Sequence, residues 1–359
     1  MIRRPLLFMF LATGCAGAWH GALGQTTGDV PTSLAWDVVS SPRDAALGGA
    51  DAAPLRGDGW TMAYHPAAMD STVRGHIHTA YLDYFAGMKA GAITLPLRPQ
   101  GRRASHVGVR FASFGDLEGL TASGQSTGTF SGGDYALQYG TAWTLDSTWV
   151  VGATGWLGLR NLAQVNAGVV GCDVGLVKRS KNGHAAWGIL VSNWGVQEDF
   201  SGIMPEGRLP LNVQFGWTQG FENAPFQLHV RYAHATTWDL APEGTYDDTY
   251  DPLTGELVPS DVWQWGDQFA RHLSGGVSLK LGAQLQGQIG YNHRRQKDMV
   301  AAGRPGMNGL SMGVRGTFKN LDYAISRSVI HFAGSSTQLG LVIRWPDWRQ
   351  NSPASAPLQ

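Results

Sequence analysis

The sequence lacks any apolar run long enough to form a transmembrane helix. Beyond the amino terminus, no segment offers about 18 consecutive apolar residues. Cysteine is scarce as well. Cys15 and Cys172 fall in different regions, and Cys15 lies in a segment that we expect to be removed. These two absences exclude a helical membrane span and a disulfide framework.

Charged residues are also few. They make up 15% of the 359 residues, and the formal net charge is +0. This balance provides no basic field for nucleic acid and no acidic field for a cationic partner. Glycine is abundant, with 49 residues. A Gly-rich, aromatic-rich and charge-poor chain suits strands and turns better than helices, in one large β domain or two ordinary ones.

Residues 1–24 have the three regions of a secretory signal peptide. Arg3 and Arg4 precede the apolar stretch 6–11, and small residues follow around 22–24. This arrangement favours a signal cleaved before Gln25 over a short buried hairpin or helix. The exported chain is then either soluble outside the inner membrane or a barrel in an outer membrane.

The end of the chain alternates with the period of a β-strand. In the run 338–345, one face carries Leu339, Leu341, Ile343 and Trp345, and the other face is mostly small or polar. Successive side chains of a strand point to opposite faces, so one face is almost wholly apolar. A soluble sheet places such a face on a core, whereas a transmembrane barrel turns it toward lipid.

The same alternation recurs along the chain and gives about 14 strands, an even number that suits a single-chain outer-membrane barrel. The other runs are 76–81, 91–97, 107–111, 135–143, 148–158, 170–179, 186–194, 211–218, 226–234, 273–281, 288–292, 309–318 and 321–326.

The connections between the runs alternate between short and long. A barrel with both ends in the periplasm predicts short turns inside and long loops at the cell surface, whereas a soluble sandwich or propeller does not. We therefore predict an all-β, antiparallel outer-membrane β-barrel over 76–345, integral to the membrane, with a tail at 346–359. The short turns are 146–147, 181–183, 282–283 and 319–320, and the long loops are 115–133, 159–169, 195–210, 235–270 and 293–308.

Residues 25–75 do not alternate. The stretch 40–50 is rich in small residues, and His65-Pro66 would end a short helix or begin a turn. An ordinary N-terminal α-strap is one interpretation. We favour a compact plug or hatch segment inside the barrel, because small residues allow close packing there.

Aromatic side chains on the outer loops suggest a protein-binding surface. Trp238, Tyr250, Trp263 and Trp265 lie in the loop 235–270, among acidic residues and without Lys or Arg. Mixed aromatic and polar groups are typical of protein interfaces. Calcium bound by acidic residues of this loop is a weaker alternative, because no EF-hand spacing is present. Those acidic residues are Asp247, Asp248 and Asp251.

A basic cluster follows at the end of the run 288–292. His293, Arg294 and Arg295 could contact anionic lipid headgroups or a phosphorylated glycan, or could form a solvated rim. We include these three residues in the predicted partner-binding surface.

Catalytic motifs are missing. The chain has no HExxH, CxxC or phosphate-binding glycine loop, and we predict no enzyme activity, no cofactor and no metal. A barrel-wall hydrolase is a less favoured alternative. It would use His331, Ser335 and Ser336, with Asp322 and Ser326 nearby, but no nucleophile elbow marks it.

Several short motifs resemble the PorV/PorQ family, most closely its PorQ branch. The likeness spans nearly the whole mature chain and implies a fatty-acid-transporter-like barrel of about 14 strands with an N-terminal plug. Two features depart from the family: His65 stands where Asn is common, and a tail follows Trp345. The motifs are 41–50 with 65–68, 290–295, 309–313, and 326–328 leading to 332–334.

The resemblance implies a component of the type IX secretion system of the Bacteroidetes lineage. It would belong to an attachment complex with PorU and PorV and would anchor a PorZ-like surface partner, where cargo is processed and joined to lipopolysaccharide. The alternative is an outer-membrane transporter of hydrophobic small molecules. A transporter needs an apolar lumen and a lateral opening, whereas the predicted inward residues are largely Gln, Arg, Ser and Gly.

Overall fold

The computed structural model describes most of the predicted barrel and part of the predicted plug. The predicted signal peptide, the tail and Trp345 lie outside the described residues, so their assignments stay predictions. The described ranges are 41–49, 51–55, 59–69, 75–84, 87–121, 123–162, 165–202, 206–242, 245–247, 249–250, 257–258, 263–298, 306–331 and 334–344.

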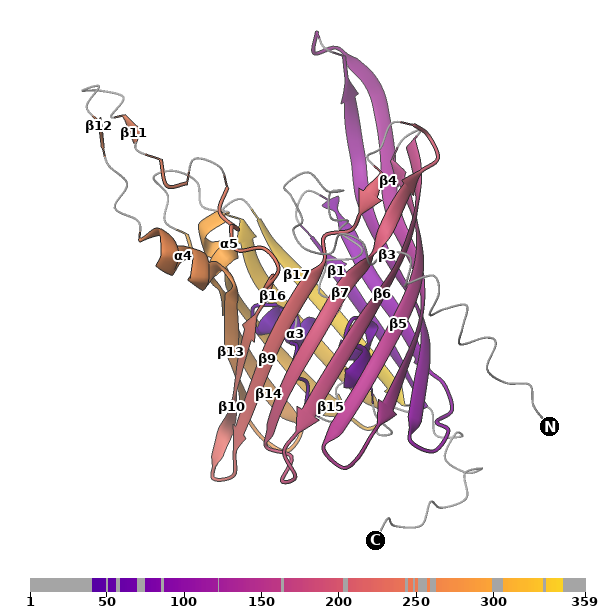
Figure 1. Ribbon diagram of the computed structural model, residues 1–359, viewed down its shortest axis with the longest axis vertical. Coiled ribbons are helices and arrows are strands. Elements are labelled where there is room, and N and C mark those ends of the chain that lie inside the picture. The colour runs from indigo at the N-terminus through magenta and orange to yellow at the C-terminus, as the bar shows by residue number, and fades with distance from the viewer. Residues whose placement is uncertain are drawn as a thin grey trace, which may run out of the picture.

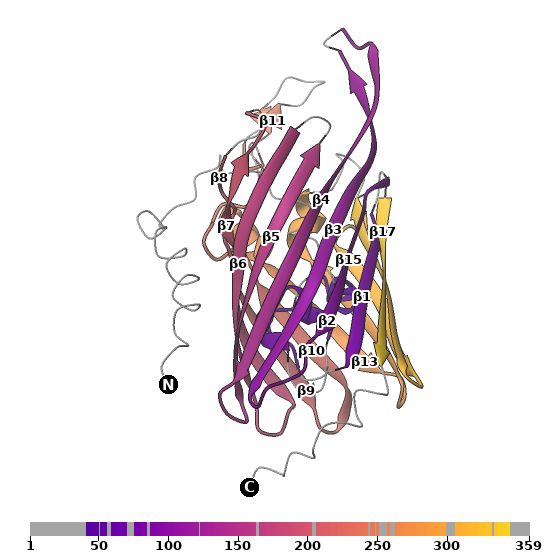
Figure 2. The same ribbon diagram turned by 90° about the vertical axis from the view of Figure 1, so that its right-hand side faces the viewer.

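Fourteen antiparallel strands close into a barrel, which confirms the predicted fold (Figures 1 and 2). The first strand pairs with the last, and each remaining strand pairs with its neighbours along the chain. The strands are β1 His76–Asp83, β2 Lys89–Pro96, β3 Arg103–Leu120, β4 Ser126–Thr144, β5 Trp149–Leu162, β6 Val165–Arg179, β7 Ala185–Asp199, β9 Asn212–Phe221, β10 Ala224–Tyr232, β13 Leu273–Lys280, β14 Leu285–Asn292, β15 Leu310–Phe318, β16 Leu321–His331 and β17 Gly334–Arg344.

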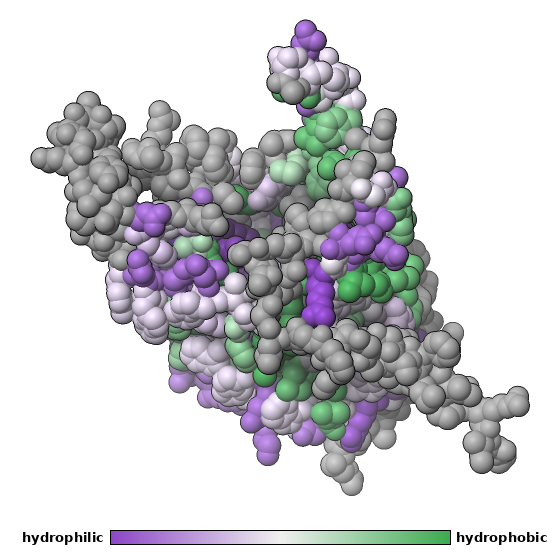
Figure 3. All heavy atoms as spheres, turned by 45° about the horizontal axis from the view of Figure 1, so that its top comes forward, coloured by the Kyte–Doolittle hydropathy of each residue, from purple (hydrophilic) through white to green (hydrophobic). Residues whose placement is uncertain are grey.

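Alternating side chains give the barrel an apolar outer face and a mainly polar inner face. Ile289 on β14 is 64% exposed on the outside, whereas its neighbour Gln288 is 4% exposed and points inward. Leu339 and Leu341 of β17 are exposed on the outer face. Gln338 of the same strand, which pairs with β16 and β1, is buried. Hydrophobic residues accordingly form patches on the outer wall in Figure 3. This outward band is what an integral outer-membrane barrel presents to lipid.

Two segments expected to be irregular loops are strands instead. Much of 115–133 extends β3 and β4 into a paired hairpin that rises above the other strands in Figure 1. Likewise, β5 and β6 reach Leu162 and Val165, so 159–169 is mostly paired. Glycine and polar residues occupy the β3–β4 extension, so no apolar alternation marks it. A hairpin that lies outside the membrane has water on both faces, so neither face needs to be apolar.

The remaining elements are short. None of the described helices has the length and apolar character that crossing a bilayer requires. They are α3 Pro42–Ala46, the 3-10 helices η1 Thr61–Ala63 and η2 Pro66–Ala68, α4 Gln264–Arg271, α5 His293–Asp298, and the two-residue strands β8 Gly207–Arg208, β11 Thr249–Tyr250 and β12 Leu257–Val258.

The described residues of 41–69 lie inside the barrel, as the plug interpretation predicts (Figure 1). Helix α3 starts with the cap residue Ser41, whose hydroxyl accepts a hydrogen bond from the Asp44 amide at 3.3 Å, and with Pro42 in its first turn. It packs on β14 to β17, while η2 packs on β4 to β6. The segment therefore bridges opposite walls, and we call its described residues the plug.

Candidate functional site in the lumen

The plug is seated on glycines of the inner wall. A Cβ atom at Gly188 would lie 2.7 Å from the carbonyl carbon of Ala52, and one at Gly216 would lie 2.6 Å from the Ala53 nitrogen. Backbone therefore packs directly on backbone, which only glycine allows at these strand positions. A Cβ at Gly152 or Gly290 would likewise meet the plug backbone, at Pro66 and at Leu47, whereas one at Gly175, Gly313 or Gly340 would come closest to plug side chains.

Buried charges also hold the plug. Arg43 Nη1 lies 3.5 Å from Asp44 and 3.4 Å from Asp51, and all three side chains are nearly inaccessible. The Thr61 hydroxyl donates to Asp44 at 3.1 Å, and His229 of β10 lies 3.8 Å from Asp51. Removing one partner of a buried pair leaves an uncompensated charge, so this network favours one seated position.

Above the plug, the inner wall carries an apolar cluster in a lumen that is otherwise polar. Its members come from the upper halves of β1 to β6 and from the segment after β8, and several are alanines. Each is at most 4% exposed, and Tyr84 packs against them. This upper apolar cluster consists of Leu82, Ala90, Ala112, Ala136, Trp156, Val169 and Leu209.

Polar side chains border the cluster. The guanidinium of Arg110 lies 5.6 Å from the centre of the Trp156 ring, a cation–π contact. His106, Gln138 and Thr154 lie nearby, at most 1% exposed, and their polar side-chain atoms have no hydrogen-bond partner among the described residues. Buried polar groups normally have partners, so these atoms mark a place for water or for a polar group of a ligand.

The wall beside the cluster has a discontinuity between β7 and β9. Their pairing ends at Ser192 and Asn212, and Asn193 has a positive φ of 62°. Above that point this edge of β7 pairs, among the described residues, with the two residues of β8, while the other edge stays paired with β6. The Leu209 amide donates to the Gly195 carbonyl at 3.0 Å. Leu209 closes this seam and places its side chain in the upper apolar cluster.

The sequence did not indicate this cluster. It suggested a lumen lined by Gln, Arg, Ser and Gly, which holds for most of the inner wall. The upper apolar cluster is the exception, and it depends on how β1 to β6 pair. Leu82 of β1 lies opposite Ala90 of β2, and Ala90 lies opposite Ala112 of β3. The only local signal was alanine at alternate positions of neighbouring runs.

The predicted partner-binding residues fall into two groups. The Trp265 ring lies between those of Trp263 and Trp238, tilted to each, with ring-centre distances of 5.7 Å to Trp263 and 6.0 Å to Trp238. All three side chains are exposed. Phe269 of α4 extends this aromatic group. Tyr250 lies in β11, and its side chain is outside the described part of the structure.

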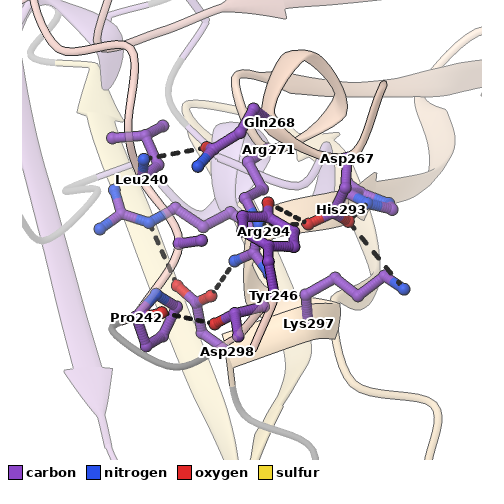
Figure 4. A network of polar contacts seen from close by, with 12 residues as sticks. Leu240, Pro242, Tyr246, Asp267, Gln268, Arg271, His293, Arg294, Lys297 and Asp298 are labelled. Atoms are coloured by element: carbon purple, nitrogen blue, oxygen red, sulfur yellow. Dashed lines mark hydrogen bonds and ion pairs between the residues drawn. The ribbon is translucent and has the colours of Figure 1, made fainter. Parts of the chain in front are cut away.

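The basic residues form no continuous cationic surface. His293 Nε2 donates to Asp267 at 3.1 Å, and Arg294 pairs with Asp298 at 3.2 Å (Figure 4). Arg295 is half-buried and close enough to Tyr84 for an electrostatic interaction. His293 thus contacts α4, the helix that carries Trp265, through an ion pair, and partner binding by these residues stays a prediction.

Asp267 organises the contact between α4 and α5. It accepts from Arg271 at 2.7 Å and from the Tyr246 hydroxyl at 2.9 Å, in addition to His293. Burial alone would raise the pKa of Asp267, but the hydrogen bonds from Arg271, His293 and Tyr246 outweigh it and lower this pKa.

The arrangement does not bring together the residues of the hydrolase alternative. Asp322 lies at the periplasmic end of β16, where Arg344 donates to it at 2.6 Å. Ser336 lies near the other end of β17, opposite Ser328. Among the residues that the structure describes, no three His, Cys, Asp or Glu side chains gather as a metal site would. Asp248 and Asp251 lie outside those residues.

The comparison with known proteins supports the fold. No protein-family model and no curated protein matches the chain. Among solved structures, the Pseudomonas putida toluene transporter TodX is similar, with 13% identity, a TM-score of 0.50, and coverage of 87% of this chain and 98% of that chain. The monoaromatic hydrocarbon channel CymD is similar too, with 14% identity, a TM-score of 0.51, and coverage of 86% and 97%.

These similarities contradict the attachment role in type IX secretion, because TodX and CymD, which are similar over most of the chain, are a toluene transporter and a hydrocarbon channel. The physical reason lies in the motifs themselves. Residues 42–46 form α3, and Gly290 and Gly313 are wall glycines beneath the plug. Such motifs encode a plugged barrel, not what the barrel does. The family resemblance and the PorZ-like, PorU and PorV partners stay untested predictions.

Proposed function

We propose that the chain is an outer-membrane channel for hydrophobic small molecules. The observation that carries the proposal is the upper apolar cluster, which offers a buried apolar surface inside a mainly polar lumen. The similarity in fold to TodX and CymD, described as a toluene transporter and a monoaromatic hydrocarbon channel, supports the same class of cargo.

The cluster suits a molecule the size of an aromatic ring. Three of its members are alanines, so the wall itself contributes little bulk, and Trp156 supplies a flat apolar surface. Burying a side chain the size of Phe stabilises by about 1.5–3 kcal/mol. A hydrophobic molecule gains a similar amount on leaving water, whereas a sugar would lose its hydrogen bonds to water over the apolar surface of the cluster and find partners only at its polar border.

Leu209 is positioned to control entry. The seam between β7 and β9 is held there by the short strand β8 and by the bond from Leu209 to Gly195. Few contacts hold this part of the wall, so it opens at lower cost than the continuous ladders beside it. Below the cluster, the plug must shift before a molecule reaches the periplasm.

The experiment fills the cluster with a larger side chain. Ala112 is fully buried and belongs to the cluster, so Ala112→Phe adds a ring where the proposed ligand would make contact. We expect uptake of radiolabelled toluene by intact cells to fall to the level of cells without the chain. Val109→Phe on the same strand is the matched control, because Val109 is 45% exposed on the outer face.

Folding of each variant is checked by heat-dependent gel mobility. Wild-type and Val109→Phe uptake above background, with loss only in Ala112→Phe, supports the channel. If wild-type cells take up toluene no faster than cells without the chain, the proposal is wrong.

A further inference from the structure

Helix α4 carries its charges on the buried side and its aromatic side chains on the exposed side. Asp267 and Arg271 are buried, and they pair with each other and with groups on α5. Trp265 and Phe269, by contrast, are 58% and 39% exposed. An ordinary surface helix has the opposite arrangement, with its apolar stripe on the core and its charges in water. A connected apolar surface of this kind marks a site that meets another molecule or a membrane.

The exposed aromatic residues form one connected group around the helix. The rings of Trp265 and Phe269, one helical turn apart, are parallel to within 1° with their centres 5.6 Å apart. Trp265 also contacts Trp263, which precedes the helix, and Trp238 from the other side of the same loop. We call Trp238, Trp263, Trp265 and Phe269 the aromatic face.

The aromatic face continues the outer wall of the barrel. Phe269 lies beside Tyr232, with their ring centres 5.9 Å apart. Tyr232 is the last residue of β10 and lies on the same side of the strand as Val230, which is exposed on the outer face. Across the ladder Tyr232 pairs with Phe215 of β9, which is exposed as well. The apolar surface that meets lipid therefore extends from the strands onto α4.

The strands that flank α4 fix its height on the barrel. The nine residues of β10 rise from a tight turn and span about 30 Å along the strand, or about 20–25 Å of height at the usual tilt. The apolar band of such a barrel is about 25 Å tall. In Figure 1, α4 lies outside the outline of the strands, beyond the upper ends of β10 and β13. The helix is therefore at the level where acyl chains give way to headgroups.

We propose that the aromatic face of α4 lies in the outer leaflet of the membrane and anchors this side of the barrel rim to the lipid surface. Aromatic rings are enriched at the boundary of headgroups and acyl chains, and an amphipathic helix there buries its apolar face by about 5–10 Å. The ion pair of Asp267 with His293 fastens the other side of the helix to α5. Both charged residues of α4 are buried, so neither lipid charge nor salt should control the anchor. The anchor does not depend on what the barrel carries.

Nitroxide labels show whether the aromatic face meets lipid. The label is attached to Trp265→Cys in the full mature chain with Cys172→Ser, reconstituted in phosphatidylcholine vesicles. Oxygen concentrates in lipid and a nickel chelate stays in water, so the ratio of their collision rates reports the surroundings. Leu341→Cys on the lipid-facing wall and Ser123→Cys near the tip of the β3–β4 hairpin give the two limits. We expect the ratio at position 265 to exceed that at position 123 severalfold and to lie closer to that at position 341.

A second variant tests the rings themselves. Trp263→Ser/Phe269→Ser in the same labelled chain should lower the ratio at position 265 severalfold, toward the value in water. The matched control is Phe221→Ser/Phe226→Ser, which removes an exposed pair of rings, 4.9 Å apart, at the opposite ends of β9 and β10. The control, added phosphatidylglycerol and added salt should each leave the ratio unchanged. Heat-dependent gel mobility confirms that each variant is folded.

Three results would overturn the anchor. A ratio at position 265 as low as that at position 123 means that the aromatic face stands in water, free for a protein partner. A label shielded from both reagents means that a second copy, or the chain itself, covers the face. A lipid-like ratio that survives Trp263→Ser/Phe269→Ser means that the rings do not hold the helix in the membrane.

Discussion

A single methyl group on the inner wall should unseat the plug. Gly188 on β7 lies under the plug at Ala52, and Gly188→Ala would place its Cβ 2.7 Å from the Ala52 carbonyl carbon and 3.0 Å from the Ala53 Cα. The Ala52 carbonyl oxygen is closer still. The backbone at Gly188 does not adopt a conformation reserved for glycine, so the overlap is the only penalty.

The size of the effect follows from these distances. Restoring ordinary van der Waals separation requires the backbone at Ala52 to move by about 1–2 Å. The wall cannot yield easily, because β7 is bonded to β6 and β9 on both sides. Overpacking of this kind costs about 1–3 kcal/mol. It would also stretch the bond from His65 Nε2 to the Ala52 carbonyl, now 3.1 Å.

Planar-bilayer conductance measures the result. We expect the wild-type barrel to be closed to ions and Gly188→Ala to show opening events, with faster proteolysis of the plug. Gly155→Ala is the control, because no atom lies within 4 Å of a Cβ at that glycine. If Gly188→Ala barrels conduct no ions and their plug resists proteolysis as in the wild type, glycine contacts do not hold the plug in place.

Three further changes test other parts of the structure. Leu209→Ala should raise toluene uptake severalfold by loosening the seam beside the cluster, and it should lower the free energy of unfolding by about 2–5 kcal/mol. Unchanged uptake would show that Leu209 does not control entry. Ile289→Arg, on the lipid face of β14, should lower the free energy of unfolding by about 2–4 kcal/mol in urea titrations in vesicles, and no loss would argue against that face meeting lipid. The lowered pKa of Asp267 means that its contribution to stability is present above its ordinary pKa and is lost as pH falls through the lowered value. Hydrogen-exchange protection factors of α4 and α5, which correct for the intrinsic pH dependence of amide exchange, should therefore fall at acid pH in the wild type, whereas those of Asp267→Asn should be lower already at neutral pH and lose this dependence.

The outward face of the barrel could be predicted because its signal is local. Leu339, Leu341 and Ile343 alternate with inward residues, and the structure exposes all three. The plug could also be predicted, since small residues around α3 leave room for backbone contact. Residues 115–133 could not be assigned, because a paired hairpin in water needs neither an apolar face nor regular alternation.

The lumen was harder to predict, because its sites depend on pairing between distant strands. Leu209 joins the cluster that contains Leu82 only because β8 pairs with the upper part of β7. Lys280 and Arg179 share a cavity only because β13 and β6 end at the same rim. Asp267 and His293 likewise meet through two helices from separate loops. In each case the residues carry no pattern that marks their partners.

The most direct measurement is the position of a hydrophobic ligand in the barrel. Apolar cavities bind small aromatic molecules, so crystals soaked with bromobenzene should show anomalous bromine density in the upper apolar cluster, beside Trp156 and Ala112. Ala112→Phe crystals should lose this density. Bromine density confined to the outer, lipid-facing wall, with none in the lumen, would contradict a channel for hydrophobic molecules.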